Sequence, residues 1–191
     1  MVGVLLIGSG AREVAIAKKI NESITPTLLY CIAPTTNPQI EQLSEQYFEQ
    51  SPTDVSGVLK LINNLSINLA VVGPENPLEA GLVDALEEIG IGCVGPKRAV
   101  AKIETSKAFA RNILDLCCPE KNPERKEFDS IDGAKEFLQH LNEDYVIKYD
   151  GLMGGKGVKI SGEHLHSIGD SLSYASSIIN GGGTFLVEEN F

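Results

Sequence analysis

Apolar residues in the first half of the chain fall into short continuous runs. These runs cover residues 2–8, 27–33, 67–73 and 91–95. A continuous apolar run of this length is typical of a strand that is buried on both faces of a parallel sheet. We therefore expect each of the four runs to form a strand of one parallel sheet.

The segments between these runs carry apolar residues three and four positions apart, which predicts helices. The predicted helices cover residues 11–20, 37–46, 53–65 and 76–90. In the last of them Asn76 would be the N-cap, Pro77 would lie in the first turn and Gly90 would end the helix. Alternating strands and helices predict a doubly wound parallel sheet with right-handed crossovers, which ends near Gly95.

The pattern changes after this point, because helices and strands become mixed and a charged, proline-bearing loop is expected over residues 119–126. Helices are predicted over residues 104–114, 132–141 and 163–179, and strands over residues 144–149, 157–160 and 184–191. The predicted fold class is therefore α/β: a doubly wound N-terminal domain followed by a small α+β unit with a glycine-rich hairpin.

The chain of 191 residues has a formal net charge of −10. An acidic surface argues against nucleic acid and against an anionic membrane as partners. Any site for an anion must therefore be a local cationic pocket. The apolar start, residues 1–11, is too short to span a membrane and lacks the basic region and cleavage site of a signal peptide.

Cysteine and histidine offer no metal-binding pattern. His164 and His166 are two residues apart, so they would not share one face of a helix. The cysteine spacings match no zinc motif, and reduced cysteines that serve packing fit a cytoplasmic enzyme. The cysteines are Cys31, Cys93, Cys117 and Cys118.

The stretch Gly8-Ser9-Gly10-Ala11-Arg12-Glu13 follows a predicted strand and opens a helix. Backbone N–H groups and the helix dipole favour an anion at such a place. Glu13 occupies the third glycine position of a dinucleotide fingerprint, which weakens that interpretation. A structural turn, a dinucleotide site and a phosphate or sugar-phosphate site all remain open. Gly73-Pro74-Glu75 also follows a strand, and it is either a ligand loop or only the start of a helix.

The segment "KYDGLMGGKGVKI", residues 148–160, is rich in glycine and lysine. It is not a Walker A loop, because Gly157 follows Lys156 and a strand, not a helix, comes next. A flap that closes over a polyphosphate, with Lys148 and Lys156 as counter-charges, competes with a solvated flexible hairpin.

Several long motifs occur in one order along the chain. They are "VLLIGSGARE", "LAVVGPENPLEAGLVDALEEIGI", "SKAFAR", the glycine-rich loop and "FLVEE". From end to end, the chain resembles the phosphoribosylamine–glycine ligase (glycinamide ribonucleotide synthetase) family of ATP-grasp enzymes. Two positions depart from the family pattern: Val14 replaces a common histidine, and "APTTNP" replaces a common Pro-Gly-Asn.

The resemblance implies an N-terminal substrate domain over residues 1–101, the start of an ATP-grasp domain over 102–119, and its lid subdomain over 120–191, which ends at the hinge. The implied substrate-binding residues are Gly10, Arg12, Glu13, Asn37, Gly73, Pro74 and Glu75. The implied ATP-binding residues are Lys107, Lys148, Gly154, Gly155, Lys156, Gly157, Glu188 and Glu189. No catalytic residue and no metal ligand is assigned within the chain.

The reaction implied by the resemblance is ATP-dependent ligation of glycine to 5-phosphoribosylamine, which gives glycinamide ribonucleotide, ADP and phosphate. The family's magnesium ligands would lie in a C-terminal half beyond this chain, so that half is an expected partner and the chain alone is expected to be inactive. The alternatives are another ATP-grasp carboxylate–amine ligase, an oxidoreductase that binds a dinucleotide, and a non-catalytic module for a nucleotide or sugar phosphate.

Overall fold

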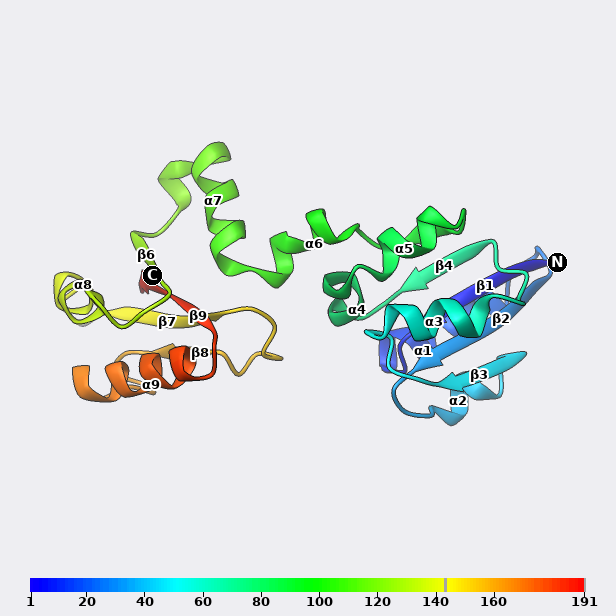
Figure 1. Cartoon of the computed structure of the whole chain (residues 1–191), viewed down its shortest axis with the longest axis horizontal. Coiled ribbons are helices and arrows are strands. Elements are labelled where there is room, and N and C mark those ends of the chain that lie inside the picture. Colours follow the sequence, from blue (N-terminus) through cyan, green and yellow to red (C-terminus); the bar gives the residue numbers. More distant parts are fainter. Residues whose placement is uncertain (143, 191) are drawn as a thin grey trace. The chain divides into compact units, whose positions relative to one another are not determined.

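The computed structural model describes residues 1–142 and 144–190. Contacts between residues divide the chain into two compact units, Met1–Ala101 and Lys102–Phe191. We call them unit 1 and unit 2 and describe each by itself. Figure 1 labels their helices and strands.

Unit 1 contains a five-stranded parallel sheet in the order β3-β2-β1-β4-β5. The strands are β1 Val2–Ile7, β2 Thr27–Ala33, β3 Gln46–Glu49, β4 Leu69–Val72 and β5 Gly92–Val94. The four predicted strands are confirmed. The strand β3 was not predicted, because its residues lie at the edge of the sheet and are only partly buried, so they form no continuous apolar run.

Helices cover both faces of this sheet, as side-chain alternation along the strands requires. Leu5 and Ile7 of β1 pack with α3, α4 and α5 in one core cluster, whereas Leu6 packs with α1 and α2 in another. The helices are α1 Ala11–Asn21, α2 Pro38–Glu41, α3 Val55–Ile62, α4 Glu75–Ala80, α5 Leu82–Glu88 and α6 Arg98–Thr105. The predicted doubly wound arrangement is therefore present.

The single helix predicted over residues 76–90 is wrong. Gly81 has a φ of +87°, which breaks the segment into α4 and α5. A glycine adopts this left-handed conformation without the steric cost that a side chain would add. The helix α4 also begins at Glu75 after Pro74, so Asn76 is not the N-cap. By contrast, Asn37 caps α2 by accepting a hydrogen bond from the Gln39 N–H at 3.0 Å.

Unit 2 contains a four-stranded antiparallel sheet in the order β6-β9-β7-β8. The strands are β6 Arg125–Phe128, β7 Tyr145–Asp150, β8 Val158–Ile160 and β9 Thr184–Glu189. The helices are α7 Lys107–Cys117, a 3-10 turn Pro119–Lys121, α8 Ala134–His140 and α9 Ile168–Asn180. One face of the sheet, with Tyr145, Ile147 and Phe185, packs against α8 and α9 to form the core.

Three predictions for unit 2 need correction. The segment 119–126, predicted as a loop, contains the 3-10 turn and the start of β6. The helix predicted to begin at residue 163 begins at Ile168, because the Ser167 hydroxyl caps it. The helix predicted to begin at residue 104 begins at Lys107 for the same reason, with Ser106 as the N-cap. Residue 191 of the last predicted strand lies outside the described residues.

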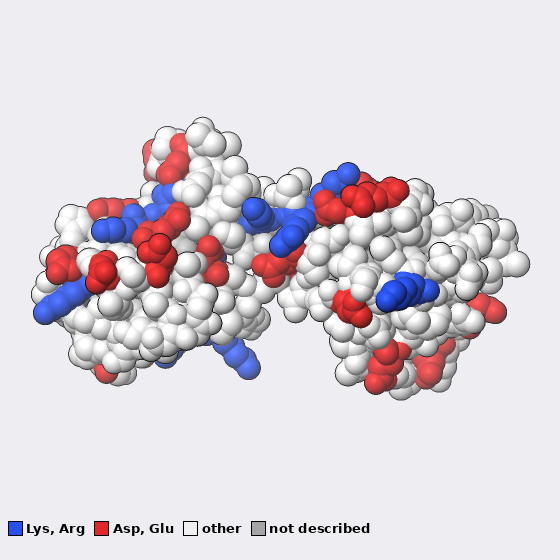
Figure 2. All heavy atoms as spheres, viewed as in Figure 1, with Lys and Arg blue, Asp and Glu red and all other residues white. Residues whose placement is uncertain are grey.

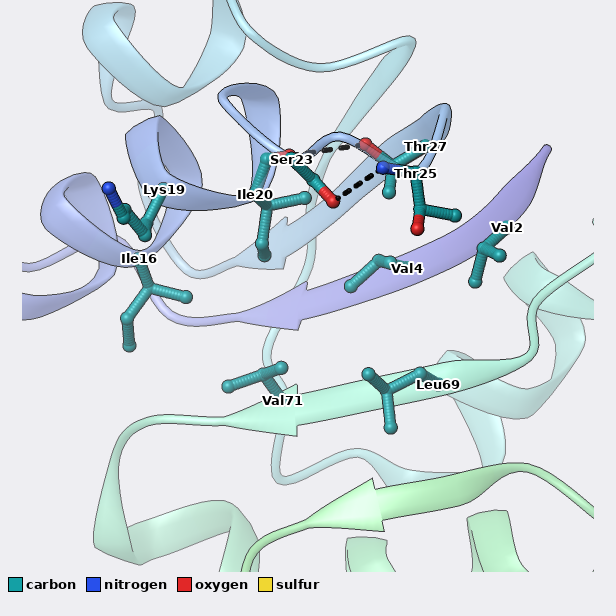
Figure 3. A pocket seen from close by; sticks show the side chains of 10 residues that line it. All are labelled: Val2, Val4, Ile16, Lys19, Ile20, Ser23, Thr25, Thr27, Leu69 and Val71. Carbon is teal, nitrogen blue, oxygen red and sulfur yellow. Dashed lines mark hydrogen bonds between the residues drawn. The ribbon is translucent and has the colours of Figure 1, made fainter.

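An apolar pocket of about 520 Å³ lies between α1 and the sheet of unit 1. Figure 3 shows Val2, Val4, Leu69 and Val71 lining it from β1 and β4, and Ile16 from α1. The lining includes Val2, Thr27 and Leu69, the first residues of β1, β2 and β4, so the pocket reaches the amino-terminal ends of these strands. Parallel sheets bind ligands at the opposite, carboxyl ends, so we assign no ligand to this pocket.

Among the described residues, no helix combines the length and apolarity that crossing a bilayer would require.

The environments of the cysteines predict an ordered pattern of thiol reactivity. Burial raises the pKa of Cys31 to about 12, whereas Cys117 and Cys118 are exposed near the end of α7. Because the thiolate is the reactive form, a thiol reagent near pH ~8 should modify the exposed pair first and Cys31 only after denaturation. Timed mass spectrometry checks this order. Equal modification rates for Cys31 and Cys118 in the folded protein would contradict the packing of unit 1.

Candidate functional site

The sheet order of unit 1 creates a reversal point between β1 and β4. The chain proceeds from β1 outward to β2 and β3, and then returns to place β4 on the other side of β1. Loops that follow the two central strands leave in opposite directions, which opens a crevice where such sheets bind ligands. The stretch Gly8–Glu13 follows β1 and Gly73-Pro74-Glu75 follows β4. Both candidate segments therefore meet at this point.

The Glu13 side chain contacts both of these segments. Its side chain is buried, and Oε2 accepts a hydrogen bond from the Gly10 N–H at 2.7 Å. The other oxygen, Oε1, lies so close to Gly73 that a Cβ added there would come within 2.1 Å of it. Within the part of the chain that the structure describes, this buried Oε1 accepts no hydrogen bond. The carboxylate thus caps α1 and requires glycine at position 73, and within the described residues its Oε1 accepts no hydrogen bond.

Arg12 and Asn37 complete the group at this edge. The Arg12 side chain is 68% exposed, and its Nη2 lies 3.4 Å from Glu75 Oε1. Asn37 Nδ2 donates to the Ser9 carbonyl at 2.8 Å, which fixes the loop after β1. The structure therefore brings all seven predicted substrate-binding residues together at the carboxyl-terminal ends of the strands.

Sequence reasoning missed a further participant at this edge. The Tyr47 hydroxyl accepts from the Asn37 N–H at 3.2 Å and donates to the Thr35 carbonyl at 2.7 Å. Tyr47 belongs to β3, the strand that the apolar pattern did not predict. Its tyrosine ring was the only available signal, and one aromatic residue does not indicate a role.

In unit 2, the polar face of the antiparallel sheet lies opposite the face that packs against α8 and α9. Side chains alternate along a strand, so Lys148 and Asp150 of β7 point to the same face. Glu188 of β9 points there as well, because it pairs with Val146, two positions before Lys148. The helix α7 lies on this face, and none of its residues is buried. Its apolar side chains are at most half-buried, so polar contacts carry much of its attachment to the sheet.

Asp150 makes the first attachment, at the N-terminus of α7. Its Oδ1 accepts from the Lys107 N–H at 2.5 Å and from the Ala108 N–H at 3.1 Å, and its Oδ2 accepts from the Ser106 hydroxyl at 3.1 Å. In return, Lys107 Nζ donates to the Gly151 carbonyl at 3.0 Å. The carboxylate satisfies N–H groups that a helix N-terminus otherwise leaves open, so the end of β7 and the start of α7 are fixed together.

Glu188 makes the second attachment, one turn further along α7. Its side chain is only 1% exposed, and Arg111 binds both of its oxygens, Nε to Oε1 at 2.8 Å and Nη2 to Oε2 at 2.7 Å. Lys148 Nζ also donates to Oε2. Burial alone raises the pKa of Glu188, but the hydrogen bonds and charges of Arg111 and Lys148 outweigh burial and lower that pKa below its ordinary value.

These groups line a pocket of about 270 Å³ between α7 and the sheet. Three cations, Lys107, Arg111 and Lys148, line this pocket together with the carboxylate of Glu188, beside Ala110, Leu114 and Val158. This local excess of positive charge contrasts with the chain's net charge of −10. Figure 2 shows acidic and basic side chains interspersed on the visible face of unit 2. The pocket has the charge that an anionic ligand needs and apolar walls that suit a flat ring.

The other predicted nucleotide residues lie apart from this pocket. Gly154, Gly155, Lys156 and Gly157 belong to the loop between β7 and β8, and the Lys156 side chain is exposed. Gly154 and Gly155 have φ values of 54° and 80°, which favour glycine. Within the described residues, Lys156 does not line the pocket.

Glu189 also lies away from the pocket, because consecutive side chains of a strand point to opposite faces. Its Oε1 accepts from the Glu124 N–H at 3.0 Å. Arg111 and Asp150 were not predicted as site residues. The signal for Asp150 was its spacing of two from Lys148 on a strand, and for Arg111 its spacing of four from Lys107 on a helix.

Among the described residues, no three histidine, cysteine, aspartate or glutamate side chains converge as a metal ion would require. The carboxylates of the two candidate sites are instead bound by backbone N–H groups, arginine or lysine. These residues therefore do not fit a magnesium site.

Two family models together match residues 2–191 of the chain. The model described as phosphoribosylglycinamide synthetase, N domain, matches residues 2–104, and the model described as phosphoribosylglycinamide synthetase, ATP-grasp (A) domain, matches residues 105–191. The chain belongs to the phosphoribosylglycinamide synthetase family. The resemblance inferred from the motifs is thereby confirmed.

Individual relatives agree with this family membership. Proteins named phosphoribosylamine–glycine ligase from Methanococcoides burtonii and Methanopyrus kandleri are 41% and 39% identical over 98% and 99% of this chain. The chain spans 43% of the length of each of these two relatives.

Solved structures confirm the predicted fold class. A phosphoribosylamine–glycine ligase from Thermotoga maritima matches 99% of this chain and 44% of its own, with a TM-score of 0.74 and 21% identity. An N5-carboxyaminoimidazole synthetase from Staphylococcus aureus, complexed with ADP, matches 100% of this chain and 48% of its own, with a TM-score of 0.77 and 11% identity. At these identities the likeness concerns the fold alone.

Replacing Asp150 should loosen the start of α7. Asp150→Ala removes the acceptor for the Lys107 and Ala108 N–H groups, so their hydrogen exchange should accelerate about tenfold, the effect of losing a helix cap. Amide exchange measured by NMR checks this. Asp54→Ala, which removes the cap of α3 in unit 1, is the matched control and should leave the α7 amides unchanged. Unaltered exchange at Lys107 in Asp150→Ala would rule out the attachment.

The lowered pKa of Glu188 predicts acid sensitivity of unit 2. A lowered carboxyl pKa stabilises the folded state above the unfolded-state pKa of about 4.5, and this contribution is lost as pH falls through the lower folded pKa. Urea unfolding of the wild type and of Glu188→Gln, from about pH 7 to about pH 3, measures the contribution of the Glu188 carboxylate to the free energy of unfolding. The stability difference should be largest at neutral pH and shrink in acid. A difference independent of pH would contradict the ionised, paired state of Glu188.

Proposed function

We propose that this chain supplies the ATP site and the phosphoribosylamine side of a phosphoribosylamine–glycine ligase. One observation carries the proposal: three cations and one buried carboxylate line an apolar-walled pocket of a chain that is otherwise strongly acidic. The ligand favoured by this charge is a polyphosphate, and the match to the ATP-grasp domain of the family supports ATP.

In the proposed reaction, a glycine carboxylate oxygen attacks the γ-phosphorus of ATP, and ADP leaves with the electron pair of the broken P–O bond. The amine of 5-phosphoribosylamine then attacks the acyl phosphate, an amide forms and inorganic phosphate leaves. The first step concentrates negative charge on the transferring group, which fixed cations stabilise. We assign that role to Lys107 and Lys148.

The glycine-rich loop has a second role in this proposal. Its root is fixed by Asp150 and Gly151, while Lys156 is exposed at its tip. Closing over the phosphates would bring Lys156 to them and exclude water, which would otherwise hydrolyse the acyl phosphate. We propose that residues 120–191 form this lid and that residues 102–119 begin the ATP-grasp domain.

The edge of unit 1 is the proposed site for the sugar phosphate. Arg12 offers an exposed guanidinium for the phosphate. Oε1 of Glu13 lies 4.0 Å from Arg12 Nε and accepts no hydrogen bond within the described residues, so it offers an acceptor for a hydroxyl or amine. Asn37 and the Gly73-Pro74-Glu75 loop would surround the ligand. Because the chain spans 43% of its relatives, we propose that turnover also needs groups of the family outside residues 1–191, including any that hold Mg²⁺.

Replacing Lys148 tests the ATP site. Lys148→Ala should raise the Kd for ATP about tenfold, the value of one charge-assisted hydrogen bond, and leave adenosine binding nearly unchanged. Isothermal titration with ATP, adenosine and NAD checks this. Lys159→Ala is the matched control, because Lys159 lies on neighbouring β8 and its ammonium stacks on Tyr174, on the other side of the sheet.

Several outcomes would overturn the proposal. Tighter binding of NAD than of ATP would favour an oxidoreductase, and equal ATP affinity in both lysine variants would remove the pocket as the phosphate site. A companion variant tests the lid: Lys156→Ala in a complete family enzyme should lower kcat/KM, since the loop cation acts on the transferring phosphate. Unchanged kinetics would exclude Lys156 from that role.

A further inference from the structure

Glu188 holds two cations of the pocket in different ways. Arg111 binds both carboxylate oxygens with the two prongs of its guanidinium, whereas Lys148 makes a single hydrogen bond to Oε2. Their side chains are 24% and 22% exposed, so both reach from the buried carboxylate to the pocket surface. The oxygen Oε2 is therefore shared, and Oε1 belongs to Arg111.

Because of this division of contacts, Lys148 can move away from Glu188 more easily than Arg111 can. If Lys148 turns toward an anion, Arg111 still satisfies both oxygens of the buried carboxylate. If Arg111 were absent, Lys148 would be the remaining cation on Glu188, and its departure would leave a buried charge unpaired. Unpaired buried charges are strongly unfavourable, so Lys148 would be retained by the carboxylate.

We propose that Arg111 is a positioning residue that keeps Lys148 available to the ligand by satisfying Glu188 in its place. The inference rests on the proposed function, in which this pocket binds the phosphates of ATP. Arg111 acts through Glu188 and Lys148, and the phosphate contact belongs to Lys148. The fork geometry matters more than the charge, because only a planar guanidinium reaches both oxygens at once.

The test is a mutant cycle on the full 191-residue chain, titrated with ATP, inorganic tripolyphosphate and adenosine. Arg111→Lys keeps the charge but loses the fork, so it should raise the Kd for ATP and tripolyphosphate about tenfold and leave adenosine unchanged. Glu188→Gln removes the charge that retains Lys148, so in this background Arg111→Lys should no longer weaken ATP binding. The double variant should bind within about threefold of Glu188→Gln, since Arg111 then has no carboxylate to satisfy.

The control is Arg98→Lys, which makes the same substitution in unit 1. Arg98 belongs to α6 and does not line the pocket. ATP affinity should therefore be unchanged in this variant. Circular dichroism of each variant confirms folding. Should Arg111→Lys not fold alone, Arg111→Met in the Glu188→Gln background, where no buried carboxylate remains, tests the same point: its affinity should equal that of Glu188→Gln.

Each outcome separates two explanations. Wild-type affinity in Arg111→Lys would overturn the inference, because charge alone would then suffice. A double variant as weak as Arg111→Lys would make Arg111 a direct phosphate ligand, and loss of ATP binding in Glu188→Gln would make Glu188 itself a ligand. Both results overturn the positioning role while leaving the ATP site intact. If the wild type binds neither ATP nor tripolyphosphate, the proposed function fails and the inference fails with it.

Discussion

The attachment of the first two turns of α7 to β7 and β9 by two carboxylates is the constraint on which the candidate nucleotide site depends. No residue of the helix is fully buried, so polar contacts contribute strongly to its position. Asp150 fixes its first turn and Glu188 fixes its second. Because both carboxylates flank Lys148 on the same face, a single arrangement sets the helix, the strand lysine and the root of the glycine-rich loop.

In the candidate site of unit 1, one carboxylate likewise fixes the elements around it. Glu13 caps its own helix and packs on Gly73, so it sets the spacing between the loop after β1 and the loop after β4. In both units, a buried or half-buried acid organises backbone and cations around a proposed ligand site. A carboxylate suits this task because it accepts several hydrogen bonds from different directions.

The fold was largely predictable because buried parallel strands leave a strong apolar signal, as in residues 2–8 and 67–73. Edge strands such as β3 and β6 leave a weak one, since half of their side chains face water. The break at Gly81 was missed because glycine also occurs within helices. Among the candidate site residues, Lys107, Lys148 and Glu188 were predicted from the family resemblance, whereas Arg111 and Asp150 are recognised only when a helix and a strand are placed together.

The anchored root of the glycine-rich loop has an entropic consequence. Fixing the backbone of one residue costs roughly 1–2 kcal/mol, so a loop that had to be ordered along its whole length would consume much of the binding energy of a nucleotide. Here Asp150 and Gly151 are already held by α7, and Gly157 is held by its carbonyl, which accepts from the Tyr149 N–H at 2.7 Å. In the proposed closure the cost would then fall on the few residues between them, which would leave more of the interaction with phosphate for affinity.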